Sequence, residues 1–376
     1  MKKTLLMSAL LVLATAISGV AVAADARVGT WNTMRLGNGD QKSYPALAAV
    51  AANVDVLAVQ EVMNDEGIQY LKLALEQRTR EKWSSLCSSP VGSRSYKEQY
   101  CFLSRDSAVQ YEDGAVSFLD RKHVFMREPY SARFKSLSDG NTFALATVHI
   151  IYGKSAADRT PELKELGNYW EWLEQVYPGE PIMLMGDFNM PPSDPAFESL
   201  RARAIPMVTD GASTLSNTSG RFANLYDNVF ANQSARSMMS GVGIVNYPAM
   251  LKVSHEDGRR AVSDHAPVFF QLGKARLGSA VQMAYSQGPA QLLHQVVNAP
   301  ARIDSVFSPR ASTGLGALST ASNTQVGSVH GNKNSHIYHL SSGCPSYGMI
   351  SEKNLVEFSS EAEAIASNYR KAGNCK

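Results

Sequence analysis

The stretch Ile182-Met183-Leu184-Met185-Gly186-Asp187-Phe188-Asn189 is an apolar run that ends in a glycine, an aromatic residue and two polar side chains. A short apolar run bounded by turn residues predicts a buried strand. In α/β proteins, functional side chains gather where such strands end. Gly, Asp and Asn also favour ordinary turns, so this motif alone does not separate a catalytic loop from a structural one.

Similar β-rich runs alternate with helix-like stretches from residue 27 to about residue 272. The strands we expect are 27–31, 54–59, 143–151, 182–185 and 267–271. The helices we expect are 44–52, 67–76 and 161–176. Pro161 suits the start of the last helix, with Thr160 as its cap. The alternation predicts an α/β domain with buried strands.

Acidic, amide and imidazole side chains recur at the ends of these strands. They are Asn32, Glu61, His149, Asp187, Asn189, Asp227, Asp264 and His265. Phosphodiester hydrolysis needs a neutralised phosphate, an activated water and a stabilised leaving oxygen. Carboxylates can hold Mg²⁺, and histidines oriented by carboxylates can move protons near neutral pH. Each residue alone could be a turn cap, a core histidine or a surface group, so the repeated placement carries the argument.

The ordered motifs along residues 26–272 resemble those of the endonuclease/exonuclease/phosphatase superfamily. They are Trp31-Asn32, Gln60-Glu61, Thr147-Val148-His149, Gly186-Asp187-Phe188-Asn189 and Ser263-Asp264-His265. Within it, the stretches 95–100, 127–129 and 183–189 are similar to pancreatic-type deoxyribonuclease I. The resemblance implies two packed β-sheets flanked by helices, a four-layer sandwich.

The resemblance also implies a role for each residue near the metal and the phosphate. Glu61 would be a principal Mg²⁺ ligand with Asn32 beside it, and Asp264 would join them. Asp187 would lie near the metal or the attacking water, and Asn189 would hold a phosphate oxygen. Assistance from Mn²⁺ or Ca²⁺ stays open.

Two carboxylate–histidine pairs are implied as well. His149 would pair with Glu98, and His265 with Asp227. One pair would activate water and the other would protonate or stabilise the leaving 3′ oxygen, which leaves a 5′-phosphate. Which histidine takes which role is not assigned.

The substrate-binding rim departs from the resembling family. Met63 stands near the position of an arginine that enters the minor groove there. Tyr96 could stack on a sugar, and Arg94 and Arg127 could contact phosphates or could be solvated surface groups. Contacts to phosphate position a nucleic acid without reading its sequence. We expect a DNA substrate and little sequence specificity, with RNA left open.

The first residues have the pattern of a secretory signal. Lys2 and Lys3 precede an apolar run from residue 5 to residue 22, and Ala21-Val22-Ala23 resembles a cleavage site. The run is near the length of a membrane span, which is the alternative. We expect residues 1–23 to be removed, leaving an exported protein, periplasmic or extracellular, without a membrane anchor. Its net charge would be zero, which by itself does not favour nucleic-acid binding.

The remaining chain divides into three parts. Residues 24–273 form the expected catalytic domain. Residues 274–330 are rich in Gly, Ser and Ala and form the expected linker, in which residues 290–297 could form a short helix. Residues 331–376 form a small module that would need a disulfide or a metal to fold. Cys87, Cys101, Cys344 and Cys375 allow three pairings, and proximity favours Cys87–Cys101 and Cys344–Cys375.

The small module is similar to the metal-binding module of the Ada repair protein. His339 stands where that module has its first cysteine, and Ala372 where it has another. A zinc site from His339, Cys344 and Cys375 would lack the usual fourth ligand, so a disulfide is favoured. Residues 274–376 hold nine Lys/Arg and five Asp/Glu, which suggests adhesion to DNA or another polyanion.

The leading hypothesis is therefore an exported, monomeric, Mg²⁺-dependent endonuclease. The main rival is a phosphoesterase of the same fold acting on lipid or inositol phosphates, of the sphingomyelinase or cytolethal-distending-toxin kind. A binding protein on an inactive scaffold fits less well, because every expected catalytic residue type is present.

Overall fold

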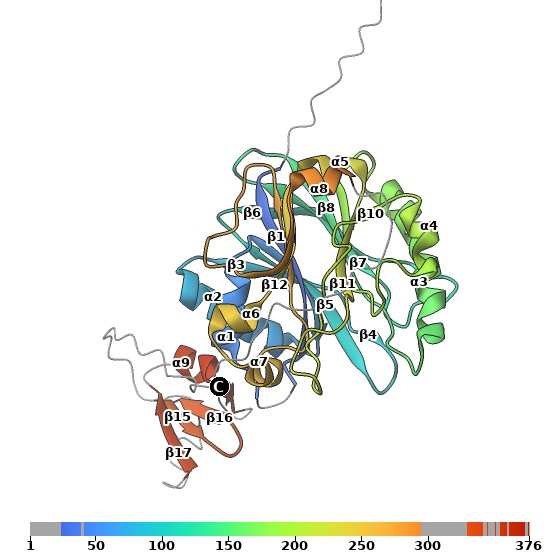
Figure 1. The fold of residues 1–376 in the computed structure, drawn as a ribbon. Coiled ribbons are helices and arrows are strands. Elements are labelled where there is room, and N and C mark those ends of the chain that lie inside the picture. Colours follow the sequence, from blue (N-terminus) through green and yellow to red (C-terminus); the bar gives the residue numbers. More distant parts are fainter. Residues whose placement is uncertain are drawn as a thin grey trace, which may run out of the picture.

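Two β-sheets pack face to face at the centre of the protein, and helices cover their outer sides (Figure 1). The computed structural model describes residues 24–38, 41–294, 329–340, 344, 350, 354–358, 361–372 and 375. The expected signal segment and residues 295–328 lie outside these ranges. No helix among the described residues is long and apolar enough to cross a membrane.

The first sheet has the strand order β14-β12-β13-β1-β2-β5-β3, with β4 paired to β5. Its strands are β1 (Ala26–Leu36), β2 (Val56–Val62), β3 (Trp83–Cys87), β4 (Val91–Gly92), β5 (Lys97–Arg105), β12 (Met239–Val245), β13 (Val268–Leu272) and β14 (Met283–Gln287). The second sheet has the order β10-β11-β9-β8-β7-β6. Its strands are β6 (Val109–Ser117), β7 (Tyr130–Ser136), β8 (Thr142–His149), β9 (Ile182–Asp187), β10 (Ile205–Pro206) and β11 (Asp227–Ala231).

Helices α1 (Tyr44–Ala51) and α2 (Asp65–Thr79) cover the first sheet, and α3 (Ala156–Val176) and α4 (Glu198–Arg201) cover the second (Figure 1). The shorter helices are α5 (Gln233–Met238), α6 (Tyr247–Leu251), α7 (His255–Ala261) and α8 (Pro289–His294). The expected α/β four-layer sandwich is confirmed.

Strand β9 is buried on both faces. Met183 and Met185 join the core between the two sheets, whereas Ile182 and Leu184 join the core under α3. Side chains alternate between the faces of a strand, so a strand covered on both sides needs apolar residues at every position. This is why the run 182–185 shows no polar alternation.

The start of α3 was predicted wrongly. The helix begins at Ala156, after the N-cap Ser155, so that Thr160 and Pro161 lie inside it. The Asp158 carboxylate accepts the backbone N–H groups of Lys154 and Ser155 at 2.7 and 2.9 Å. Those bonds satisfy free donors at the helix start more than one turn before Pro161.

The stretch predicted to be a linker contains part of the first sheet. Strand β14 pairs with β12, matching Val242 with Gln287 and Ile244 with Tyr285. Helix α8 follows, near the short helix allowed at 290–297. A truncation at residue 274 would therefore remove a strand of the catalytic domain.

A separate four-stranded sheet forms in the C-terminal part that the structure describes. It comprises β15 (Val329–Asn332), β16 (Ile337–Leu340), β17 (Leu355–Phe358) and β18 (Arg370–Lys371), with α9 (Glu361–Ala366) beside it. Tyr70 and Leu73 of α2 pack against its apolar cluster. The module is thus in contact with the catalytic domain.

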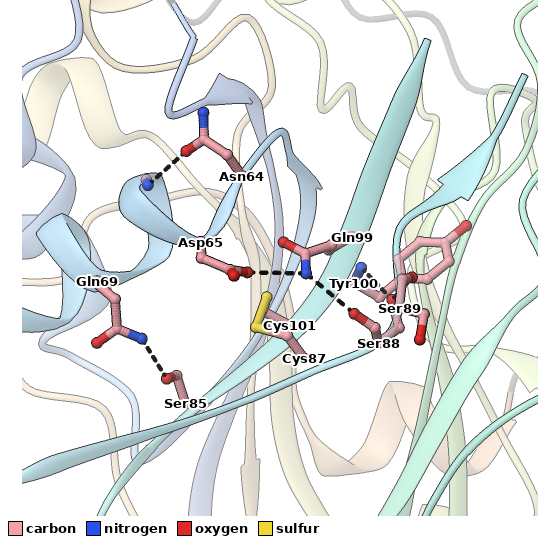
Figure 2. The surroundings of a disulfide bond; sticks show 11 residues. Asn64, Asp65, Gln69, Ser85, Cys87, Ser88, Ser89, Gln99, Tyr100 and Cys101 are labelled. Atoms are coloured by element: carbon pink, nitrogen blue, oxygen red, sulfur yellow. Dashed lines mark hydrogen bonds between the residues drawn. A yellow bond between two sulfur atoms is a disulfide. The ribbon is translucent and has the colours of Figure 1, made fainter. Parts of the chain in front are cut away.

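Both disulfides join the cysteines that sequence proximity favours. Cys87–Cys101 links β3 to β5, and Cys344–Cys375 lies in the small module. Figure 2 shows Gln99 beside the first disulfide, where its Nε2 donates to Asp65 Oδ1 at 3.1 Å. These contacts hold β5 against α2 beside Glu98, which directly precedes Gln99.

Candidate active site

Gly186 brings β8 and β9 close together where the two strands end. Its φ is +142°, and a Cβ atom placed on it would lie 2.0 Å from the carbonyl oxygen of Val148. The parallel register of these strands pairs His149 with Asp187, and the antiparallel register of β9 and β11 pairs Asp187 with Asp227. Three candidate residues therefore stand side by side on the second sheet.

The first carboxylate–histidine pair joins the two sheets. Nδ1 of His149, on β8, lies 2.9 Å from Oε1 of Glu98, on β5. The phenol oxygen of Tyr100 accepts the backbone N–H of His149 at 2.9 Å. Burial favours the uncharged forms, but the attraction between the partners dominates, so the pKa of Glu98 is lowered and that of His149 is raised.

The second pair also joins the sheets. Nδ1 of His265, just before β13, lies 2.8 Å from Oδ2 of Asp227, on β11. The indole N–H of Trp31 donates to the carbonyl of His265 at 2.7 Å, which fixes the backbone behind the ring. Burial raises the pKa of Asp227 to about 6. Despite burial, Asp227 and Asp187 raise the pKa of His265 well above its ordinary value.

Asp187 lies between the two imidazoles. Its Oδ2 is 3.5 Å from Nε2 of His149 and 3.6 Å from Nε2 of His265. Its Oδ1 accepts the backbone N–H of Asn189 at 2.9 Å. Burial opposes ionisation, but the two histidines lower the pKa of this carboxyl. Both rings thus direct their outer nitrogens at one point.

Glu61 and Asp264 place two further carboxylates beside this point. Glu61 has a φ of +58° at the end of β2, and its Oε1 lies 4.0 Å from Nε2 of His149. One hollow of about 420 Å³ is lined by Glu61, Asp264 and Asp187 together with both histidines. Carboxylate oxygens are the donors that Mg²⁺ prefers, so the residues that line this hollow fit such an ion.

The side-chain amide of Asn32 links two carboxylates of the site. Its Nδ2 donates to Glu61 Oε1 at 3.0 Å and to Asp187 Oδ2 at 3.1 Å. Its Oδ1 accepts the backbone N–H of Met34 at 2.9 Å. In this arrangement the amide N–H groups orient the two carboxylates.

A second acidic cluster differs from the predicted metal set. Ligand atoms of Asp187, Asp227 and His265 all lie within 4.8 Å of one another. The buried Oδ1 of Asp227 has no hydrogen-bond partner among the described residues. In the small module, ligand atoms of His339, Cys344 and Cys375 also lie within 4.8 Å of one another, but the two sulfurs are joined in a disulfide and are therefore not thiolate ligands.

The predicted substrate-binding residues divide into surface and interior groups. Arg94 is exposed, and Tyr96 is half-buried with the guanidinium of Arg35 at 5.8 Å from its ring centre. Arg127 is buried, donates from Nε to the carbonyl of His149 at 3.0 Å and lies 3.8 Å from Glu98. Arg127 thus supports the first pair from beneath.

Asn189 is held as part of the backbone frame of the site. Its φ is +50°, and its Nδ2 donates to the carbonyl of Ile150 at 2.8 Å. Its own carbonyl accepts from the guanidinium of Arg159 at 2.7 Å. Asn189 lines the hollow together with His149 and His265.

Two charged residues at the site, Lys42 and Arg259, were not found from the sequence. Lys42 is buried beside Glu61 and Asp264, donates to the carbonyl of Val262 at 2.7 Å, and has its pKa lowered to about 8 by burial. Arg259 lies 3.4 Å from Asp264. Arg259 comes five residues before Asp264, and this closeness in the sequence could have identified it as a residue of the site. Lys42 has no comparable local signal.

Two packed sheets with carboxylate–histidine pairs around a buried aspartate define a hydrolytic enzyme of the α/β class. The model of the Endonuclease/Exonuclease/phosphatase family matches residues 29–265. The chain belongs to this family.

Relatives with similar sequences are named as deoxyribonucleases. A "Deoxyribonuclease" of Thioalkalivibrio sp. (strain K90mix) is 45% identical over 66% of this chain and 71% of its own length. "Deoxyribonuclease-1" of Gallus gallus is 29% identical over 68% of this chain and 94% of its own. "Deoxyribonuclease-1" of Canis lupus familiaris is 29% identical over 73% and 100%.

Proposed function

We propose that this protein is an exported, divalent-metal-dependent endonuclease that hydrolyses DNA with little sequence specificity and leaves 5′-phosphates. The observation that carries the proposal is the convergence of His149 and His265 on one oxygen of Asp187, beside the carboxylate of Glu61. The names of the relatives support DNA as the substrate. We further propose that the protein acts as a monomer.

The acidic groups have the character of a Mg²⁺ site. Glu61 and Asp264 would hold the ion, with Asp187 close by. When bound, the ion would neutralise phosphate charge and help to acidify water. Asn32 keeps Glu61 and Asp187 in place through its amide N–H groups.

The two histidines supply proton transfer. One imidazole would take a proton from the attacking water at Nε2, and the other would give a proton to the leaving 3′ oxygen. Glu98 and Asp227 bind the Nδ1 sides, so each ring presents Nε2 to the hollow. Either assignment of base and acid is compatible with this near-symmetric arrangement.

Plasmid nicking tests the reaction. We expect the purified protein to convert supercoiled DNA to nicked circles with Mg²⁺ and to stop with EDTA, and we expect ligase to reseal the nicks because they carry 5′-phosphates. If the protein does not cleave DNA but hydrolyses sphingomyelin or inositol phosphates, the rival phosphoesterase hypothesis replaces the nuclease proposal.

Histidine substitutions test the residue roles. His149→Ala and His265→Ala should each lower kcat by about 10²- to 10⁴-fold, the usual contribution of a general acid or base. His123→Ala, outside the hollow, is the matched control and should keep wild-type turnover. Near-normal activity in either active-site variant would remove that histidine from the mechanism.

A further inference from the structure

Tyr152 presents an aromatic ring at the mouth of the active-site hollow. It follows His149 by three residues and lines the same hollow of about 420 Å³. Its side chain is 60% exposed, in contrast to the buried aromatic residues of the two cores. Single exposed aromatic residues are common on protein surfaces, so the informative observation is the position of this ring, in the same hollow as His149 and Asp187.

Arg159 backs the ring on one side. Its guanidinium carbon lies 4.3 Å from the centre of the Tyr152 ring. Arg159 is only 7% exposed, and its Nε donates to the carbonyl of Tyr152 at 2.7 Å. A planar cation held against one face of the ring leaves the other available to a ligand.

The backbone on both sides of Tyr152 is held in place. The N–H of Ile151 donates to Glu162 Oε2 at 2.9 Å. The N–H of Lys154 donates to Asp158 Oδ2 at 2.7 Å. The backbone that carries the ring is therefore already ordered, and the contact with Arg159 holds the ring itself, which lowers the cost of ordering when a ligand binds.

We propose that Tyr152 forms a stacking subsite for an unpaired nucleobase next to the scissile phosphate. This proposal rests on the proposed nuclease function. A flat ring beside groups that cleave phosphodiesters fits a planar base, because every base has a face that can stack on an aromatic side chain. Within a duplex both faces are already stacked, so the subsite favours single-stranded or locally opened substrates.

The test uses the full-length protein and two oligonucleotides. Each contains one cleavable phosphodiester among methylphosphonate linkages, and one of them has abasic residues flanking the cleavable bond. For the wild type, kcat/KM should fall about tenfold when the bases are removed, equivalent to about 1.4 kcal/mol. Tyr152→Leu should show a similar loss on the base-containing oligonucleotide and little further loss on the abasic one.

Two variants separate stacking from structure. Tyr152→Phe keeps the ring and should behave like the wild type on both oligonucleotides. Tyr111→Leu removes another partly exposed tyrosine, far along the chain on β6, and should leave the response to base removal unchanged. If Tyr152→Leu and the wild type lose the same factor on base removal, the subsite is refuted. If the wild type cleaves both oligonucleotides equally well, the subsite fails while the nuclease proposal stands. If the wild type cleaves no DNA at all, the nuclease proposal fails first.

Discussion

Replacing Gly186 with alanine should destabilise the protein strongly. The backbone φ of +142° at this residue is one that side-chain-bearing residues rarely adopt. The added Cβ would also lie 2.0 Å from the carbonyl oxygen of Val148 and 3.0 Å from its carbonyl carbon. These are backbone atoms of the adjoining strand, so no side-chain rotation can relieve the overlap.

The magnitude follows from these two effects. Backbone strain of this kind costs about 1–3 kcal/mol, and forcing an extra carbon into a packed site costs about 1–3 kcal/mol more. We expect a loss of about 4 kcal/mol in the free energy of unfolding. For a domain of this size that corresponds to a fall in Tm of roughly 8–16 °C.

Thermal unfolding followed by circular dichroism measures the effect. Gly179→Ala is the matched control, because Gly179 also has a positive φ, +77°, but has no atom within 4 Å of the added Cβ. The control should lose only about 1 kcal/mol through backbone strain. Equal losses in the two variants would show that the close approach of β8 and β9 at Gly186 is not what the structure indicates.

Three further predictions concern the surroundings of the site. Arg127→Ala should lower the free energy of unfolding by about 3 kcal/mol, because it leaves the buried Glu98 carboxylate with one cationic partner fewer; an unchanged urea midpoint would contradict this. The double variant Cys87→Ser/Cys101→Ser should lose about 3 kcal/mol, since the disulfide closes a loop with a sequence separation of 14, and unfolding of both proteins with urea measures it. Leu73→Ser should speed proteolytic release of the C-terminal module, because it removes an apolar contact between α2 and the module, while the Tm of the catalytic domain stays unchanged.

The sequence predicted the strands well where tertiary packing reinforces the local pattern. The run before Gly186 is apolar at every position because β9 is covered on both faces. The start of α3 was missed because Pro161 is a conspicuous signal for a helix start, whereas the bonds of Asp158 to the preceding backbone depend on a loop that folds back. Strand β14 was missed because its pairing with β12 has no pattern within the segment itself.

By itself the sequence determined which chemical groups the site contains and that they stand where strands end. The tertiary structure alone decided how they combine. Each carboxylate–histidine pair joins one sheet to the other, so the pairing depends on how the sheets pack and not on any local period. The same packing turns both imidazoles toward Asp187, buries Arg127 beneath the site and leaves Tyr152 exposed at its mouth. These outcomes depend on contacts between residues far apart in the chain, which neighbouring residues do not encode.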